Sequence, residues 1–246
     1  MVTRILLASL VSVLTVATVD ATTSAPSNSP IQTDNGSAPA ATPATIRKQA
    51  AELRRRNEHN KAVALLVAGI KATQGDHDLI VDLVDTFNES GQYEKAIKLC
   101  NAMIADNEKD GAAWGGLGYA LFETKEPQKA ALALRRAIEI NDKDDVAACN
   151  LAWLYNDAGQ YMDAIKVCSA FLSKDERCNG LWRELGFAYL KTDEHKKAVK
   201  ALTKALELDP RDKPSYEYLA DAHKAAGRDD LAAEALAKRD EMMKKK

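Results

Sequence analysis

The stretch CNLAWLYNDAGQYMDA, residues 149–164, has the spacing of an amphipathic helix followed by a turn. Read as a helix, it places Ala148, Leu151, Ala152 and Tyr155 on one face. Trp153 points away from that face. The largest side chain of the stretch therefore lies off the predicted core face and needs a separate explanation.

The same pattern of apolar positions returns at a fixed interval of 34 residues. One register contains Ala62, Ala96, Ala130, Ala164, Ala198 and Ala232. A second register contains Leu83, Leu117, Leu151, Leu185 and Leu219. Two registers that agree over most of the chain predict a repeat protein built from helical units.

The first 42 residues do not follow this pattern. One Arg precedes an uncharged run from Ile5 to Val19, and Val19 and Ala21 form a small-residue cleavage site, so residues 1–21 have the pattern of a secretory signal peptide. The run is shorter than the roughly 20 apolar residues of a spanning helix. The alternative is a membrane anchor at residues 4–19. Residues 22–42 are rich in Ser, Thr, Ala and Pro, which predicts a disordered linker.

Composition narrows the function classes. The chain has 246 residues, of which 46% are hydrophobic and 28% charged, as in ordinary globular proteins. A net charge of −2 gives no general attraction for nucleic acid or anionic lipid. We expect no nucleic-acid partner, and no membrane contact in the mature form.

The segment LWRELGFAYLKTDEHKKAVKALTKALELDP resembles the tetratricopeptide repeat family. It contains the family's signature residues Trp182, Leu185, Gly186, Tyr189, Ala198, Ala205 and Pro210. The resemblance covers residues 43–246 and gives the repeats 43–76, 77–110, 111–144, 145–178, 179–212 and 213–246. It implies an all-α fold, a right-handed superhelical solenoid of six 34-residue helix-turn-helix repeats.

Details within the repeats have physical reasons. Gly91, Gly159 and Gly227 share one position, where a glycine can end the first helix. Gly118 and Gly186 allow the two helices of a repeat to approach closely. Gln49 and Arg239 replace apolar residues in the end repeats, whose outer faces we expect to be polar because no neighbour covers them.

The resemblance also places Trp153, because family members contact ligands mainly through positions 2, 5, 9, 12 and 13 of each repeat. Position 9 holds Tyr119, Trp153 and Phe187 in consecutive repeats, and position 12 adds Phe122 and Leu190. We expect these residues to form a partner-binding stripe in the concave groove. The alternative is that the aromatic side chains fill the seam between neighbouring first helices.

Charged residues near the stripe are candidates for orienting a bound segment. Arg183, Lys191 and Asp157 take this role in the prediction. The clamp with which some family members hold the acidic tails of heat-shock chaperones is a poor match, since only Asn150 fits it. A co-chaperone of that kind is not expected.

The sequence shows no sign of catalysis. The four His lack a second ligand at metal spacing, and no nucleophile elbow or phosphate-binding glycine loop occurs. We therefore expect no enzyme, no cofactor and no metal site.

The cysteines and glycosylation sequons leave alternatives open. Cys149 and Cys178 fall near the same end of one hairpin, which allows a disulfide after export, although four free thiols are the expected outcome. Asn35 and Asn88 lie in sequons, and a glycan on Asn88 would obstruct the groove in a eukaryotic secretory pathway.

The predicted function is that of an exported adaptor without enzymatic activity. Its concave groove would hold a segment of a protein or peptide partner, in a periplasmic or secreted setting such as a cell-envelope or secretion assembly. The alternatives are a chaperone-like factor and a scaffold that self-associates through its end repeats or through Met242 and Met243.

Overall fold

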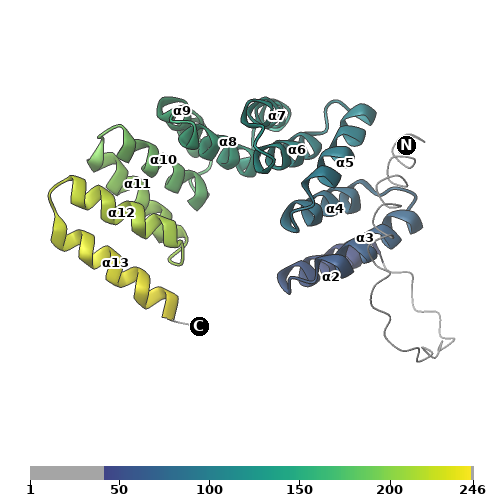
Figure 1. Cartoon of the computed structure of the whole chain (residues 1–246), viewed down its shortest axis with the longest axis horizontal. Coiled ribbons are helices and arrows are strands. Elements are labelled where there is room, and N and C mark those ends of the chain that lie inside the picture. The colour runs from purple at the N-terminus through teal and green to yellow at the C-terminus, as the bar shows by residue number, and fades with distance from the viewer. Residues whose placement is uncertain (1–41, 245–246) are drawn as a thin grey trace. The chain divides into compact units, whose positions relative to one another are not determined.

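A computed structural model describes residues 42–244, which consist of helices joined by short turns (Figure 1). The helices are α2 Pro43–Arg55, α3 His59–Ala72, α4 His77–Glu89, α5 Tyr93–Asp106, α6 Gly111–Glu123, α7 Pro127–Ile140, α8 Asp145–Asp157, α9 Tyr161–Leu172, α10 Asn179–Lys191, α11 His195–Leu208, α12 Lys213–Ala225 and α13 Asp229–Lys244. The predicted signal peptide and all but the last residue of the linker lie outside the described residues. Within residues 42–244, no helix is both long and apolar enough to cross a membrane.

The described chain forms two compact units. The N-terminal unit ends at Ala130 and the C-terminal unit begins at Ala131, so α7 starts in one and continues in the other. Each interval of 34 residues counted from Pro43 contains two helices. The two units are described separately below.

Aspartate side chains fix where several first helices begin. Asp76, Asp110 and Asp144 occupy the same repeat position and accept hydrogen bonds from the backbone N–H groups of Leu79, Ala113 and Ala147, at 3.1, 3.1 and 2.9 Å. An N-cap carboxylate satisfies an N–H group that has no partner within the helix. At α2 the side chain of Thr42 has this role, and Pro43 takes the first helical position.

The turn inside each hairpin requires a left-handed residue. Gly91, Gly159 and Gly227 have φ angles of 72°, 72° and 71°, so the predicted glycine turn is confirmed. The first, third and fifth hairpins have Asn57, Lys125 and Asp193 at this turn instead, with φ angles of 61°, 64° and 60°. A left-handed lysine costs roughly 1–2 kcal/mol, which the surrounding hairpin must offset.

Small residues let the helices of a hairpin pack closely. A methyl group added to Gly186 would lie 2.5 Å from Cγ of Leu202, a fully buried side chain on α11. This confirms the predicted close approach at Gly186. Ala148, Cys168 and Leu181 form a buried cluster with other residues of α8, α9 and α10, and no more than 1% of any of these three side chains is exposed.

Two asparagines tie successive hairpins together. The side-chain amide of Asn88 donates to the carbonyl of Gly116 at 3.2 Å, and that of Asn156 donates to the carbonyl of Glu184 at 3.0 Å. Both asparagines occupy position 12 of alternate repeats. Both side chains are buried and their amide nitrogens are paired, so each bond fixes how the first helix of one hairpin lies on the first helix of the next.

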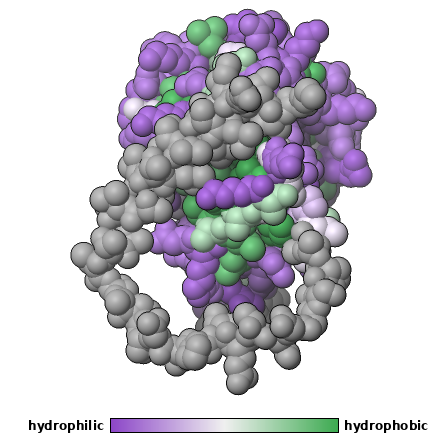
Figure 2. Space-filling view, turned by 90° about the vertical axis from the view of Figure 1, so that its right-hand side faces the viewer, coloured by the Kyte–Doolittle hydropathy of each residue, from purple (hydrophilic) through white to green (hydrophobic). Residues whose placement is uncertain are grey.

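The outer surface of the first hairpin is less polar than expected. Gln49 is exposed, but α3 also leaves Val63, Leu65 and Val67 partly exposed. Figure 2 shows the side that lies at the right of Figure 1, where hydrophobic residues are visible between hydrophilic ones. Gln49 makes the outer face of α2 more polar, but the outer face of α3 keeps apolar side chains.

Candidate functional site

Helix α8, the first complete helix of the C-terminal unit, carries two exposed apolar side chains on one face. Val146 is 66% exposed and Trp153 is 39% exposed, and their separation of seven positions, about two helical turns, places both on the same side of the helix. The core face consists of Ala148, Leu151 and Ala152, none more than 2% exposed. Trp153 thus lies off the core face, as the pattern predicts.

Phe187 lies in a different environment from Trp153. Its ring is tilted against Tyr218 of α12 with 4.8 Å between centroids, and it meets Tyr161 of α9 edge-on at 6.4 Å. The ammonium of Lys191 lies 5.2 Å from the centroid of the same ring. These contacts fit the seam interpretation for Phe187. Leu190 packs against the buried cluster of Ala198, Leu202 and Ala222.

Arg183 is held by carboxylates of its own unit. Its Nε donates to Glu184 and its Nη1 donates to Asp212, both at 3.1 Å. The side chains of Glu184 and Asp212 are only 4% and 7% exposed, and that of Arg183 is 24% exposed. Asn156 donates to Glu184 and Ser215 donates to Asp212, which completes a network across α8, α10 and α12.

Burial dominates the electrostatics of this network. It raises the pKa of Glu184, an effect that the hydrogen bonds from Asn156 and Arg183 partly oppose. Burial similarly raises the pKa of Tyr218. The contacts of the Arg183 guanidinium are with Glu184 and Asp212 of its own unit, which is a structural role. A role of Arg183 in orienting a ligand stays a prediction.

The aromatic residues predicted in the third repeat belong to the N-terminal unit. Tyr119 is half-buried, and burial together with the nearby Glu123 raises the pKa of its phenol. Lys125 lies over the ring of Phe122, 5.8 Å from its centroid. A continuous stripe from Tyr119 to Phe187 would cross from one unit to the other, and it stays a prediction.

The acidic face of α4 is paired with α2. Arg47 bridges Asp78 and Asp82 at 2.7 and 2.8 Å. Arg54 lies 3.6 Å from Asp85 and 3.5 Å from Glu89. Arg47 and Arg54 of α2 thus pair with four carboxylates of α4 within the N-terminal unit.

Asn88 is not a groove residue open to modification. It is 6% exposed, and the amide nitrogen that a glycan would occupy donates to the carbonyl of Gly116. The sequence placed Asn88 at an open groove position, and its burial contradicts that placement.

All four cysteines are free thiols in the structure, so Cys149 and Cys178 are not bonded to each other. Cys100 and Cys168 are fully buried. Burial raises the pKa of Cys149 to about 12 and also raises the pKa of the other three thiols. Disulfide formation requires a thiolate, so these pKa shifts oppose the Cys149–Cys178 bond at neutral pH.

We expect Cys178 to be alkylated first when the folded protein is treated with iodoacetamide at pH 7.5. It is half-buried, whereas Cys100 and Cys168 are inaccessible and Cys149 ionises only near pH 12. Below that pH, labelling of Cys149 should rise about tenfold per pH unit. Peptide mapping measures each site, with denatured protein as the control. Early labelling of Cys100 or Cys168 would contradict the assignment.

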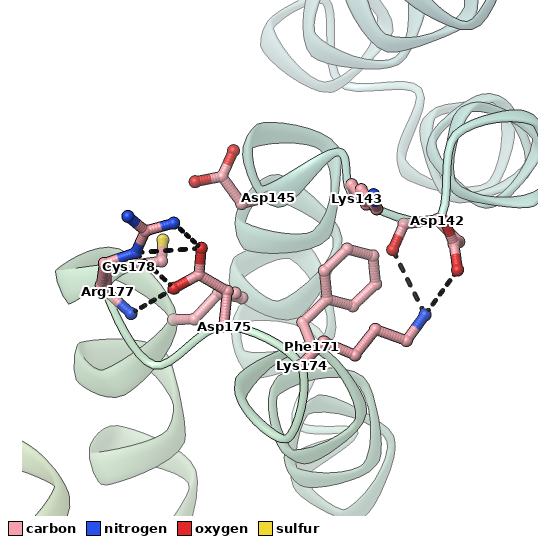
Figure 3. A pocket seen from close by; sticks show the side chains of 9 residues that line it. Asp142, Lys143, Asp145, Phe171, Lys174, Asp175, Arg177 and Cys178 are labelled. Atoms are coloured by element: carbon pink, nitrogen blue, oxygen red, sulfur yellow. Dashed lines mark hydrogen bonds and ion pairs between the residues drawn. The ribbon is translucent and has the colours of Figure 1, made fainter.

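A cavity of about 660 Å³ opens at one edge of the C-terminal unit (Figure 3). It lies between the loop before α8 and the loop before α10, and nine residues line it. These are Asp142, Lys143, Asp145, Phe171, Lys174, Asp175, Arg177, Cys178 and Leu181. The sequence did not lead us to predict this cavity. Its one signal in the sequence is Cys178, because the equivalent position of other repeats holds an aspartate: Asp76, Asp110, Asp144 and Asp212. Among the described residues, no cluster of three or more His, Cys, Asp or Glu is arranged to hold a metal ion.

Three tetratricopeptide repeat models match the chain, over residues 87–148, 133–166 and 180–212. The matches agree with the helical hairpins and their 34-residue spacing. The chain is a tetratricopeptide repeat protein, and its fold is an all-helical solenoid of that type. Such a fold is typically a scaffold for protein–protein interactions without enzymatic activity.

Curated relatives match over a small part of their own length. Human Superkiller complex protein 3 is 32% identical over 135 residues, which are 52% of this chain and 8% of that protein. The general transcriptional corepressor trfA of Dictyostelium discoideum is 26% identical over 122 residues, 49% of this chain and 9% of that protein. The chain thus spans less than a tenth of these relatives.

Solved structures share the fold at low sequence identity. A MamA structure from Desulfovibrio magneticus RS-1 is 20% identical with a TM-score of 0.59, covering 68% of this chain and 94% of that one. YrrB, described as a tetratricopeptide repeat protein with an unusual peptide-binding site, is 19% identical with a TM-score of 0.50, covering 70% and 88%. At these identities the likeness shows the fold alone.

Proposed function

We propose that this protein is an exported adaptor without enzymatic activity, which holds a segment of a partner protein on the exposed face of α8. The observation that carries the proposal is the pair Val146 and Trp153, two large apolar side chains exposed on one side of a first helix. Trp is among the residues that contribute most at protein interfaces. An exposed apolar pair in an interaction scaffold is best explained by a partner that covers it.

Charged side chains nearby favour a partner segment of mixed charge. Lys191 on α10 is exposed beside Phe187, and Asp157 is exposed at the end of α8. Exposed charges of this kind contribute mainly to orientation and to the rate of encounter. The anchor of the segment would therefore be apolar, and its flanking residues would set its direction.

Export is the part of the proposal that rests on sequence. Residues 1–21 have the signal-peptide pattern, and residues 22–42 would separate the cleavage site from the first hairpin. Amino-terminal sequencing of the protein recovered outside the cytoplasm tests it. A mature chain that begins near Thr22 supports export, and retention of residues 1–19 in a membrane fraction supports the anchor.

Replacing Val146 with aspartate is expected to reduce partner capture at least tenfold without loss of stability. The new carboxylate would lie on the apolar face, yet in the first turn of α8, where a negative charge suits the helix dipole. The measurement is affinity capture from extracts of the source organism with immobilised residues 22–246. Met162→Asp is the matched control, because Met162 is 68% exposed but lies on the second helix α9. Equal capture by the wild type and both variants would rule out the α8 face.

One observation favours the alternative of a self-associating scaffold. Residues 43–72 contain seven basic and two acidic residues, whereas residues 229–244 contain five acidic and three basic residues. Opposite ends of two copies would attract each other, and Met243 is 44% exposed in the acidic end. Light scattering at low and high salt separates the two functions: a monomer at both supports the adaptor.

A further inference from the structure

The cavity in Figure 3 is separate from the proposed binding face of α8. It is built where the loops 141–144 and 173–178 lie side by side at one edge of the C-terminal unit. Its volume of about 660 Å³ is within the usual range of roughly 300–1,000 Å³ for ligand sites.

The floor of the cavity is apolar. Leu181 is 1% exposed, and Phe171 and Cys178 are half-buried beside it. All three belong to the packed core of α8, α9 and α10, which holds them in place. A ligand that reaches this floor meets a ring, a thiol and a leucine, and therefore gains most from an apolar group.

The rim is charged but balanced. Lys174 pairs with Asp142 at 2.8 Å, and Arg177 pairs with Asp175 at 2.6 Å. Figure 3 shows the ring of Phe171 between these two pairs. Lys143 and Asp145 complete a set of three cations and three carboxylates, so the rim has no net charge. It creates no field that would concentrate a phosphate, a polyanion or a free cation.

We propose that this cavity is a second docking site, which takes one large apolar side chain, aromatic or leucine-like, from a protein partner. The side chain contacts Phe171 and Leu181, and the polar rim receives the partner's adjacent peptide groups. An apolar centre with a polar rim is the usual anatomy of the buried point of a protein interface.

The repeat pattern supports an apolar occupant. Four of the equivalent positions hold an aspartate, and Cys178 stands in that place on the cavity wall. An aspartate here would add a fourth carboxylate beside Phe171 and would give the cavity a net negative charge. The thiol instead keeps the floor apolar and the rim neutral.

Cys178 also makes the proposal testable by thiol–disulfide exchange on the whole protein. The probes are Ac-Phe-Cys-NH₂, Ac-Ala-Cys-NH₂, Ac-Asp-Cys-NH₂ and Ac-Lys-Cys-NH₂, each supplied as its mixed disulfide with 2-mercaptoethanol. In each exchange the Cys178 thiolate attacks the probe's sulfur and 2-mercaptoethanol leaves, with no net oxidation. At equilibrium we expect the Phe probe to occupy Cys178 at least tenfold more than the Ala probe, with the Asp and Lys probes near the Ala level.

Two controls separate the cavity from general reactivity and from the α8 face. In the variant Cys178→Ser/Ser173→Cys, the thiol lies exposed on the same loop, and the preference for Phe should disappear. The variant Val146→Asp should leave the preference for Phe at Cys178 unchanged. A failure of the proposed function can therefore be distinguished from a failure of the cavity proposal. Equal occupancy by all probes at Cys178, a preference for Asp or Lys, or the same Phe preference at Ser173→Cys would overturn the proposal.

Discussion

Replacing Arg183 with alanine is expected to lower the free energy of unfolding by about 3–5 kcal/mol. The guanidinium is the cation that pairs with both Glu184 and Asp212, whose side chains are 4% and 7% exposed. Removing it leaves two carboxylates buried at the junction of α10 and α12 without a positive charge. Urea unfolding followed by circular dichroism measures the loss. Arg183→Lys is the control, which keeps the charge but cannot bridge both carboxylates with a planar fork.

The loss should depend on pH in a direction set by Glu184. Burial raises the pKa of Glu184 in the folded protein above its unfolded value. The folded state then holds the proton more tightly than the unfolded state. The free energy of unfolding therefore falls as pH rises from the unfolded pKa to the folded pKa of Glu184. Without Arg183 the folded pKa rises further. The deficit of Arg183→Ala should therefore be larger at pH 8 than at pH 5, and an equal deficit at both would contradict the role of the buried carboxylate.

Much of the fold could be predicted because the repeat period itself is in the sequence. The glycine turn at Gly91 and the close packing at Gly186 follow from residues that tolerate few other structures. Lys125 and Asp193 adopt the same left-handed turn without a glycine to signal it. Their conformation is imposed by the hairpin on both sides, which local propensity does not encode.

The candidate site was only partly predictable. Helical spacing places Trp153 off the core face, but it cannot say how much of the ring a neighbouring helix covers. Phe187 occupies the same repeat position, and Tyr218 of the next first helix covers it. Arg183 was expected to face a ligand, yet its partners Glu184 and Asp212 are internal. Those contacts depend on the packing of neighbouring repeats, as does the cavity beside Cys178.

The two aromatic side chains should therefore respond differently to truncation. Phe187→Ala is expected to lower the free energy of unfolding by about 3–5 kcal/mol, because the ring packs against Tyr161 and Tyr218. Trp153→Ala should lower it by about 1 kcal/mol or less, since 39% of Trp153 is exposed and the core face of α8 does not include it. Thermal and urea unfolding of the two variants measure these values.

Partner binding should show the opposite order. Truncating an anchor residue of an interface costs about 2 kcal/mol or more, equal to roughly a thirtyfold loss of affinity, so Trp153→Ala should bind poorly while it stays folded. Phe187→Ala, measured below its melting temperature, should keep most of its affinity because its ring lies in the seam between helices. If Trp153→Ala unfolds readily and its folded fraction binds normally, Trp153 is seam packing like Phe187. The adaptor function would then need a different surface from the α8 face.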